Sequence, residues 1–344
     1  MPRHRWLNVH RELTPRQHTL LGIVAFVLPL MLWALVSYVP WIWHPMIKVS
    51  DPGSVSWLKP GLQLDRHEFA TQVALAQSTG AAVPMGERAN PIYLPAPHAV
   101  GRALYTAFTT APVLRGDLWL HESLWMSIKT IFWGFVISSV VGVPLGILCG
   151  AFAAVSRSTE PFVDFVRYMP APAFGALMVA VFGIRLEPKI AIIVIGTFFQ
   201  QVLVVANTVR KVDSGLLEAA QTLGARRRQL VLRVLVPASL PEIYSDLRIL
   251  LGWAWTYLIV AEVIGVSSGI TFFINQQAKY RNFDNVYAAI VIIGIIGLAT
   301  DQALAWLGRR IFAWKRNRPS RLTSFVNRFF AGGNALVLRD PPSS

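Results

Sequence analysis

Residues 216–237 read LLEAAQTLGARRRQLVLRVLVP, a basic and helix-like segment inside a chain built mainly from aliphatic and aromatic residues. Of the 344 residues, 54% are hydrophobic and only 15% are charged, whereas soluble domains carry about 25% charged residues. The mean hydropathy is clearly positive. This composition predicts an all-α, polytopic membrane protein, in which the quoted segment is a connection outside the bilayer.

The remaining composition excludes several classes of function. The net charge of +14 does not indicate nucleic-acid binding, because the basic residues cluster at the ends of apolar runs. Cys149 is the single cysteine, so an intramolecular disulfide framework and a cysteine-based zinc site are excluded. The sequence contains no phosphate-binding loop of the G-x-x-x-x-G-K-[ST] type and no hydrolase motif. We therefore expect no enzymatic site, cofactor or metal in this chain.

Apolar runs predict about six transmembrane helices, because each is close to the roughly 20 residues that a helix needs to cross the hydrocarbon. The first run lacks a cleavage site of small residues and is therefore expected to span the membrane. No internal repeat is visible. The predicted spans are 20–39, 130–155, 168–184, 190–209, 243–266 and 286–307.

The distribution of Lys and Arg predicts the orientation. If the N-terminus is cytoplasmic, the inside segments hold 19 Lys and Arg, against 10 in the outside segments. Cytoplasmic connections are enriched in these residues. We therefore expect a multi-pass protein of the bacterial cytoplasmic (inner) membrane, with both termini and the connection 210–237 on the cytoplasmic side.

These spans divide the chain into four parts. Residues 1–43 form the cytoplasmic N-terminus and first helix, and 44–121 form a cap on the outer face with a short helix near 64–78. Residues 122–311 form the transmembrane core, which includes the connection 210–237. Residues 312–344 form a basic cytoplasmic tail, of which 321–330 is expected to lie on the membrane surface.

The connection 210–237 is predicted to be ordered. Asp213 is placed to cap a helix over 215–223, and Gly224 suits the left-handed conformation that ends such a helix. A second short helix over 226–235 is expected to stop at Pro237.

The next helix is expected to begin at Ser239, because Glu242 follows three positions later as in a capping box. Two interpretations of the connection remain open at this point. It is either a positively charged loop kept out of the membrane or a docking element for another protein.

The residues of the connection resemble a known motif. Glu218-Ala219-Ala220, Gly224 and the terminal Val234-Leu235-Val236-Pro237 are similar to E-A-A-x3-G-x9-I-x-L-P. That motif belongs to the membrane subunits of binding-protein-dependent ABC importers, the MetI-like permeases. The segments VDSGLLEAAQTLGA and LRILLGWAWTYLIVAEVIGVSSGI resemble the branch that imports nitrate, taurine, alkanesulfonates and bicarbonate. The resemblance covers about 91–314, so the insertion at 44–90 and the tail depart from it.

The resemblance implies a transport subunit rather than an enzyme. Two permeases, commonly identical, would line one pathway, while separate ABC ATPase subunits hold ATP and magnesium and a periplasmic solute-binding protein delivers a small anion. The short helix of the motif would dock on the ATPase. By position, the docking residues would be Glu218, Ala219, Ala220, Leu223, Gly224, Ala225, Arg226 and Pro237.

Polar, aromatic and proline residues within the spans are candidates for lining the pathway. Each has an equally ordinary structural interpretation: a proline kink, an aromatic anchor at the interface, or a buried charge in a packing network. The candidates are Pro170, Pro172, Gln200, Gln201, Trp253, Tyr257 and Glu262. Asp301 must likewise face protein or water. Gly142, Gly146 and Gly150 recur every four residues and predict close helix packing within the subunit.

The alternative from another class is a secondary transporter or channel driven by an ion gradient. It predicts inverted repeats and intramembrane ionisable pairs, neither of which is evident in the sequence.

Overall fold

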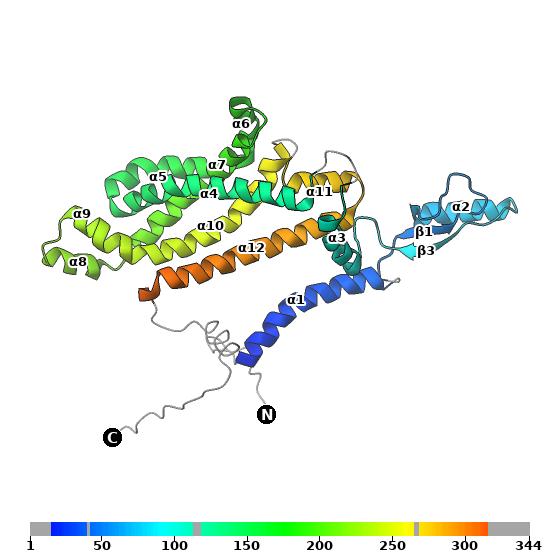
Figure 1. Ribbon diagram of the computed structural model, residues 1–344, viewed down its shortest axis with the longest axis horizontal. Helices are drawn as coiled ribbons and strands as arrows, with labels where there is room; N and C mark the ends of the chain where they lie inside the picture. Colours follow the sequence, from blue (N-terminus) through cyan, green and yellow to red (C-terminus); the bar gives the residue numbers. More distant parts are fainter. Residues whose placement is uncertain (1–14, 40–41, 113–117, 265–267, 316–344) are drawn as a thin grey trace, which may run out of the picture. The chain divides into compact units, whose positions relative to one another are not determined.

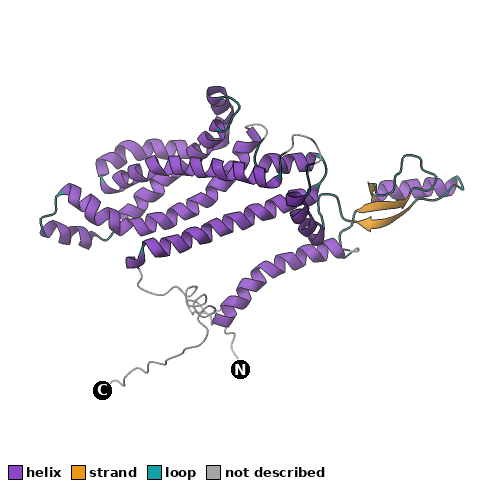
Figure 2. Ribbon diagram, viewed as in Figure 1, coloured by secondary structure: helices purple, strands orange, loops and turns teal. Residues whose placement is uncertain are grey.

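The computed structural model describes residues 15–39, 42–112, 118–264 and 268–315, which are largely helical (Figure 2). Helix α1 (Pro15–Tyr38) is followed by a small insertion and by α3 (Pro97–Thr109). The helices that follow include α4 (Leu120–Ala151), α7 (Glu187–Arg210), α10 (Val236–Ile264), α11 (Ile270–Lys279) and α12 (Phe283–Ile311). The predicted surface segment 321–330 lies outside the described residues.

Five helices in the described residues are long and apolar enough to cross a membrane, or six if one bent pair counts as a span. They lie in α1, α4, α7, α10 and α12, in agreement with five of the predicted spans. Helix α4 begins ten residues earlier than predicted, at Leu120, and ends at Ala151 rather than at 155.

The third predicted span, 168–184, is wrong as a single helix. Its place is taken by a 3₁₀ turn, η1 (Ala171–Phe174), and the short helix α6 (Gly175–Phe182). Helix α5 (Ala153–Arg167) ends before this segment. The cause is local, because Pro170 and Pro172 cannot donate backbone hydrogen bonds and restrict the residues before them.

The insertion after α1 contains a β-sheet that the sequence did not predict. Strands β1 (Met46–Asp51), β2 (Gln63–Asp65) and β3 (Met85–Ala89) form an antiparallel sheet in the order β2-β1-β3. Helix α2 (Arg66–Ser78), close to the predicted 64–78, packs on this sheet (Figure 1). Their shared core contains Ile47, Val49, Leu58, Leu64 and Phe69.

The chain divides into two compact units. The first comprises Met1–Ile137, Pro170–Gly196 and Ala254–Gly297, and the second comprises Ser138–Met169, Thr197–Trp253 and Leu298–Ser344.

Within the second unit, the glycine row of α4 packs against α7. A Cβ on Gly146 would lie 2.7 Å from Cβ of Val205, and one on Gly150 would lie 2.6 Å from Cβ of Val209. The predicted packing surface is therefore confirmed within one chain. The helix backbones come this close because glycine has no side chain.

Candidate functional site

The connection 210–237 contains a helix with both ends capped. Helix α8 (Ser214–Thr222) begins where Asp213 Oδ1 accepts a hydrogen bond from the Gly215 N–H at 2.9 Å. It ends in two backbone bonds, from Ala225 N–H to the Ala220 carbonyl at 3.0 Å and from Gly224 N–H to the Gln221 carbonyl at 2.9 Å. This pair of bonds is the Schellman arrangement, so α8 is an ordered element.

Gly224 has φ of 81°, which confirms the left-handed conformation predicted for it. A Cβ at this position would meet no atom within 4 Å. The requirement for glycine is therefore one of backbone conformation rather than of space, because the left-handed region disfavours residues with a Cβ.

The prediction that Pro237 ends the second helix is wrong. A short helix, α9 (Arg227–Gln229), runs into a π-helical turn, η2 (Leu230–Leu235), and then directly into α10. The Val236 N–H bonds to the Val231 carbonyl, five residues back. The wider π turn lets the chain pass Pro237 without breaking, because proline is tolerated in the first turn of a helix.

The predicted capping box at Ser239 is also wrong. The Ser239 hydroxyl donates to the Leu235 carbonyl at 2.8 Å, as serine does inside a helix. The capping interaction lies earlier, where the Gln229 side chain accepts from the Arg226 N–H at 2.8 Å.

Most of the surface of helix α8 is exposed to solvent. None of its residues is buried, and Leu223, immediately after it, is 89% exposed. One side chain anchors it, since Leu217 packs against a core cluster that includes Leu235 and Ile243. Glu218 is exposed and makes no side-chain hydrogen bond or ion pair within the described part of the chain. The helix is thus fixed on one side and free on the other.

Each basic residue near this loop is exposed or paired within the second unit. Arg226, Arg227 and Arg228 are exposed. Arg210, at the end of α7, pairs with Glu160 of α5 and donates to the Ser156 hydroxyl at 3.0 Å. The ion pair ties the segment leading into α8 to α5.

The pathway candidates of the second unit differ in burial, from fully buried to half exposed. Gln201 is fully buried and its amide donates to the Ser139 hydroxyl at 3.2 Å. Trp253 is 50% exposed, and Gln200 is half-buried. Asp301 forms an ion pair with Arg248 at 2.8 Å and stays partly exposed, so the expectation that it faces protein or water is confirmed.

In the first unit, Pro170 and Pro172 shape the turn before α6. Tyr257 packs beside Gly196 and a core cluster containing Ile192 and Ala261. These three residues therefore have structural contacts of their own. None of the pathway candidates lines the apolar cleft of this unit.

Glu262 is the centre of a buried polar cluster in the first unit. Only 3% of it is exposed, and its carboxyl group accepts hydrogen bonds from the Ser127 hydroxyl and, at 2.8 Å, from the Thr271 N–H. The Ser127 hydroxyl in turn accepts from the Ile270 N–H at 2.8 Å. These bonds join α4, α10 and the start of α11.

A second buried charge holds the same turn. Lys189, which is 2% exposed, donates to the carbonyl of Ser268 at 2.7 Å and to its hydroxyl at 3.1 Å. Gly269 follows with φ of 108°, and a Cβ there would collide with the Glu262 carboxyl group. Sequence reasoning identified Glu262 but missed Ser127 and Lys189. The signal available for Ser127 was its recurrence with Ser123 one turn earlier in an apolar helix.

The chain is similar to membrane subunits of known transport systems. Residues 142–313 match the family model described as the binding-protein-dependent transport system inner membrane component. A putative ABC transporter permease of Methanocaldococcus jannaschii is 34% identical over 228 residues, which cover 66% of this chain and 84% of that protein.

Two further relatives carry substrate names. The taurine transport system permease of Escherichia coli is 32% identical over 65% of this chain and 81% of its own length. The putative aliphatic sulfonates transport permease of Bacillus subtilis is 32% identical over 60% of this chain and 74% of its own length.

Among solved structures, an inward-facing MetNI methionine ABC transporter aligns with a TM-score of 0.51 at 22% identity. The alignment covers 56% of this chain and 95% of that one. At this identity, the likeness concerns the fold.

Proposed function

Because the chain belongs to the family of binding-protein-dependent transport system inner membrane components, we propose that α8 is the surface on which a separate ATPase docks. The chain is the permease subunit of an ABC importer and a multi-pass membrane protein. This membership decides against the transporter or channel driven by an ion gradient.

The observation that carries the proposal is an exposed helix with ordered ends, packed against the core through Leu217. Free helices of this length are marginal in water, yet α8 is capped at both ends and held by Leu217 while Leu223 stays 89% exposed. A large exposed apolar side chain beside a carboxylate and small alanines fits a groove on another protein.

The proposed coupling runs from α8 into the transmembrane core. Helix α8 contacts η2, and the segment Arg227–Ile264 continues from there as one helical stretch of 38 residues. A movement of α8 would therefore displace the start of the membrane span Arg227–Ile264. ATP can favour one facing of the pathway only through contacts that differ between the two states.

The complete importer would contain several partners. ATP and magnesium would bind to the ATPase subunits, a periplasmic solute-binding protein would deliver the solute, and a second copy of the permease would complete the pathway. Both termini and the 210–237 loop would face the cytoplasm, in accord with the distribution of Lys and Arg.

The solute is proposed to be a small anion such as a sulfonate, taurine, nitrate or bicarbonate. The support is that relatives named for taurine and aliphatic sulfonates are each 32% identical to this chain. Titration of the partner binding protein with each anion tests this. If none of these anions binds, the solute assignment fails while ATPase docking stands.

The docking proposal is tested with Glu218→Lys in the assembled importer. We expect the variant to reach the membrane but to lose solute-stimulated ATP hydrolysis and uptake, because a carboxylate that meets the ATPase becomes an ammonium group. Glu68→Lys is the matched control, since Glu68 is an exposed glutamate on α2. Normal stimulation in the Glu218 variant would show that α8 is not the docking surface.

A further inference from the structure

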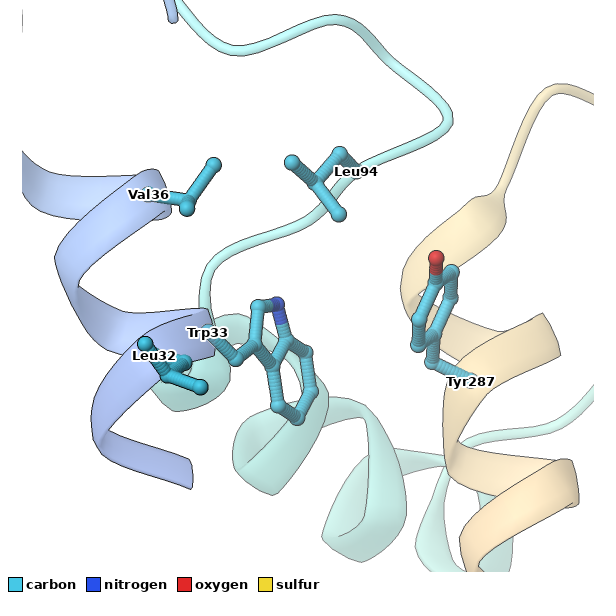
Figure 3. A pocket seen from close by; sticks show the side chains of 5 residues that line it. All are labelled: Leu32, Trp33, Val36, Leu94 and Tyr287. Atoms are coloured by element: carbon cyan, nitrogen blue, oxygen red, sulfur yellow. The ribbon is translucent and has the colours of Figure 1, made fainter. Parts of the chain in front are cut away.

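The first unit contains an apolar cleft beside the first membrane span. Figure 3 shows Leu32, Trp33 and Val36 of α1 facing Leu94 of the connecting loop and Tyr287 of α12. These five side chains line a space of about 370 Å³, within the range of about 300–1,000 Å³ typical of ligand sites. The rings of Trp33 and Tyr287 are stacked, with their centroids 5.7 Å apart.

Apart from the Tyr287 hydroxyl group, the lining side chains offer no free polar atom to water or to a polar solute. The Trp33 indole N–H is already used, because it donates to the Pro95 carbonyl at 3.0 Å. The other lining groups are aliphatic apart from the Tyr287 ring. An apolar cleft gives water few hydrogen-bond partners, and its walls lose dispersion contacts unless an apolar group fills the space.

The exposed side chains of helix α1 indicate the environment outside the cleft. Large apolar side chains on every side of the helix are exposed, including Leu20, Val24, Phe26 and Met31 at 54%, 43%, 70% and 64%. A helix that is apolar all round belongs in hydrocarbon, and this one is a membrane span with none of its apolar window buried. On its exposed sides, the segment beside the cleft therefore faces acyl chains.

Polar contacts mark the outer limit of that hydrocarbon. The Tyr38 hydroxyl bonds to Nδ1 of His98 at 2.6 Å, and the Asn90 side chain donates to the Ser37 carbonyl at 3.0 Å. Trp33 lies five residues before Tyr38, or about 7.5 Å along the helix at 1.5 Å per residue. The cleft thus lies just inside the interface, where the methylene groups of a phospholipid are found.

We propose that this cleft holds one acyl chain of a bilayer phospholipid, seated between α1, the Leu94 loop and α12. The chain fills the space that protein leaves open, and it links α1 to the rest of the unit below the polar contacts at Tyr38. The occupant is distinguished from the surrounding annular lipid by its retention, because it contacts protein on three sides.

The test uses the full permease with a phosphatidylglycerol that carries a diazirine in its acyl chain. The protein is reconstituted in vesicles, transferred to lipid-free detergent to strip annular lipid, irradiated and analysed by peptide mass spectrometry. We expect labelling at Val36, Leu94 or Tyr287 to survive the transfer, and labelling near Phe26 to be lost.

Two substitutions control for the cleft itself. Val36→Trp fills the space and should abolish the retained label, while Leu94→Ala enlarges it and should keep the label. Leu94→Trp is a second filling variant, on the loop, should Val36→Trp not fold. Equal labelling along α1 after transfer, or retention in a filled variant, overturns the proposal because the lipid is then annular only. An unlabelled cleft before transfer also overturns it, since protein then covers the cleft.

Discussion

Substituting Ser127 with alanine tests whether the cluster around Glu262 stabilises the first unit. The change removes a donor to the buried carboxyl group and leaves the Ile270 N–H without its acceptor. A hydrogen bond to a charged group is worth about 1.5–3 kcal/mol, and an orphaned buried donor costs about 1–3 kcal/mol. We therefore expect the free energy of unfolding to fall by about 2.5–6 kcal/mol.

The same helix provides a matched control. Ser123 lies one turn earlier and, like Ser127, is 0% exposed, but its hydroxyl has no hydrogen-bond partner within the described residues. Ser123→Ala deletes a buried polar atom that makes no bond, so it should leave stability unchanged or slightly raised. Both variants remove a buried serine hydroxyl group from α4, but only the Ser127 hydroxyl makes hydrogen bonds in the described part of the chain.

Thermal unfolding of the purified permease in detergent, followed by loss of the monodisperse peak in size-exclusion chromatography, measures both effects. We expect Ser127→Ala to lower the midpoint by on the order of 5–10 °C and Ser123→Ala to leave it in place. Equal midpoints for the two variants would refute the reasoning, because the bonds of Ser127 would then contribute nothing.

Two further comparisons use pairs of glycines. Gly224 and Gly269 both have left-handed φ values, but only a Cβ at Gly269 would collide with the Glu262 carboxyl group. Gly269→Ala should therefore lower the midpoint in the same thermal assay. Gly224→Ala should instead cost about 1–2 kcal/mol of local backbone energy and weaken ATPase co-purification, with folding intact. Gly146→Ala should lower the thermal midpoint because its Cβ would lie 2.7 Å from Cβ of Val205. Gly252→Ala, with no atom within 4 Å of the new Cβ, should raise stability by about 0.5–1 kcal/mol. A higher thermal midpoint for Gly146→Ala than for Gly252→Ala would contradict the packing of α4 on α7.

Hydropathy predicted most of the membrane spans because crossing a bilayer is a requirement on length and polarity that each segment meets by itself. The loop helix α8 was predictable for a similar reason, since Asp213 and Gly224 cap it through local backbone bonds. Some predictions from local sequence failed because a neighbouring segment changed the backbone hydrogen bonds. Pro237 was expected to end a helix, but the π turn before it moves the backbone bonds into a register that proline tolerates.

The remaining errors concern contacts that are distant in the sequence. Ser127 and Glu262 are 135 positions apart, so nothing near either residue identifies the other. Strand β3, with the sequence MGERA, lacks the apolar alternation that marks a strand. It becomes one by pairing with β1, which begins almost 40 residues earlier.

The pairing of β1 with β3 also determines how the insertion after α1 is attached. Met46, at its start, is the cross-strand partner of Ala89, at its end, and such partners have Cα atoms about 5 Å apart. The chain thus leaves and rejoins the membrane-proximal part at a single point, with a separate core enclosed between the two crossings. An insertion built this way behaves as a detachable module: its length and sequence can vary without changing the separation of the residues that flank it.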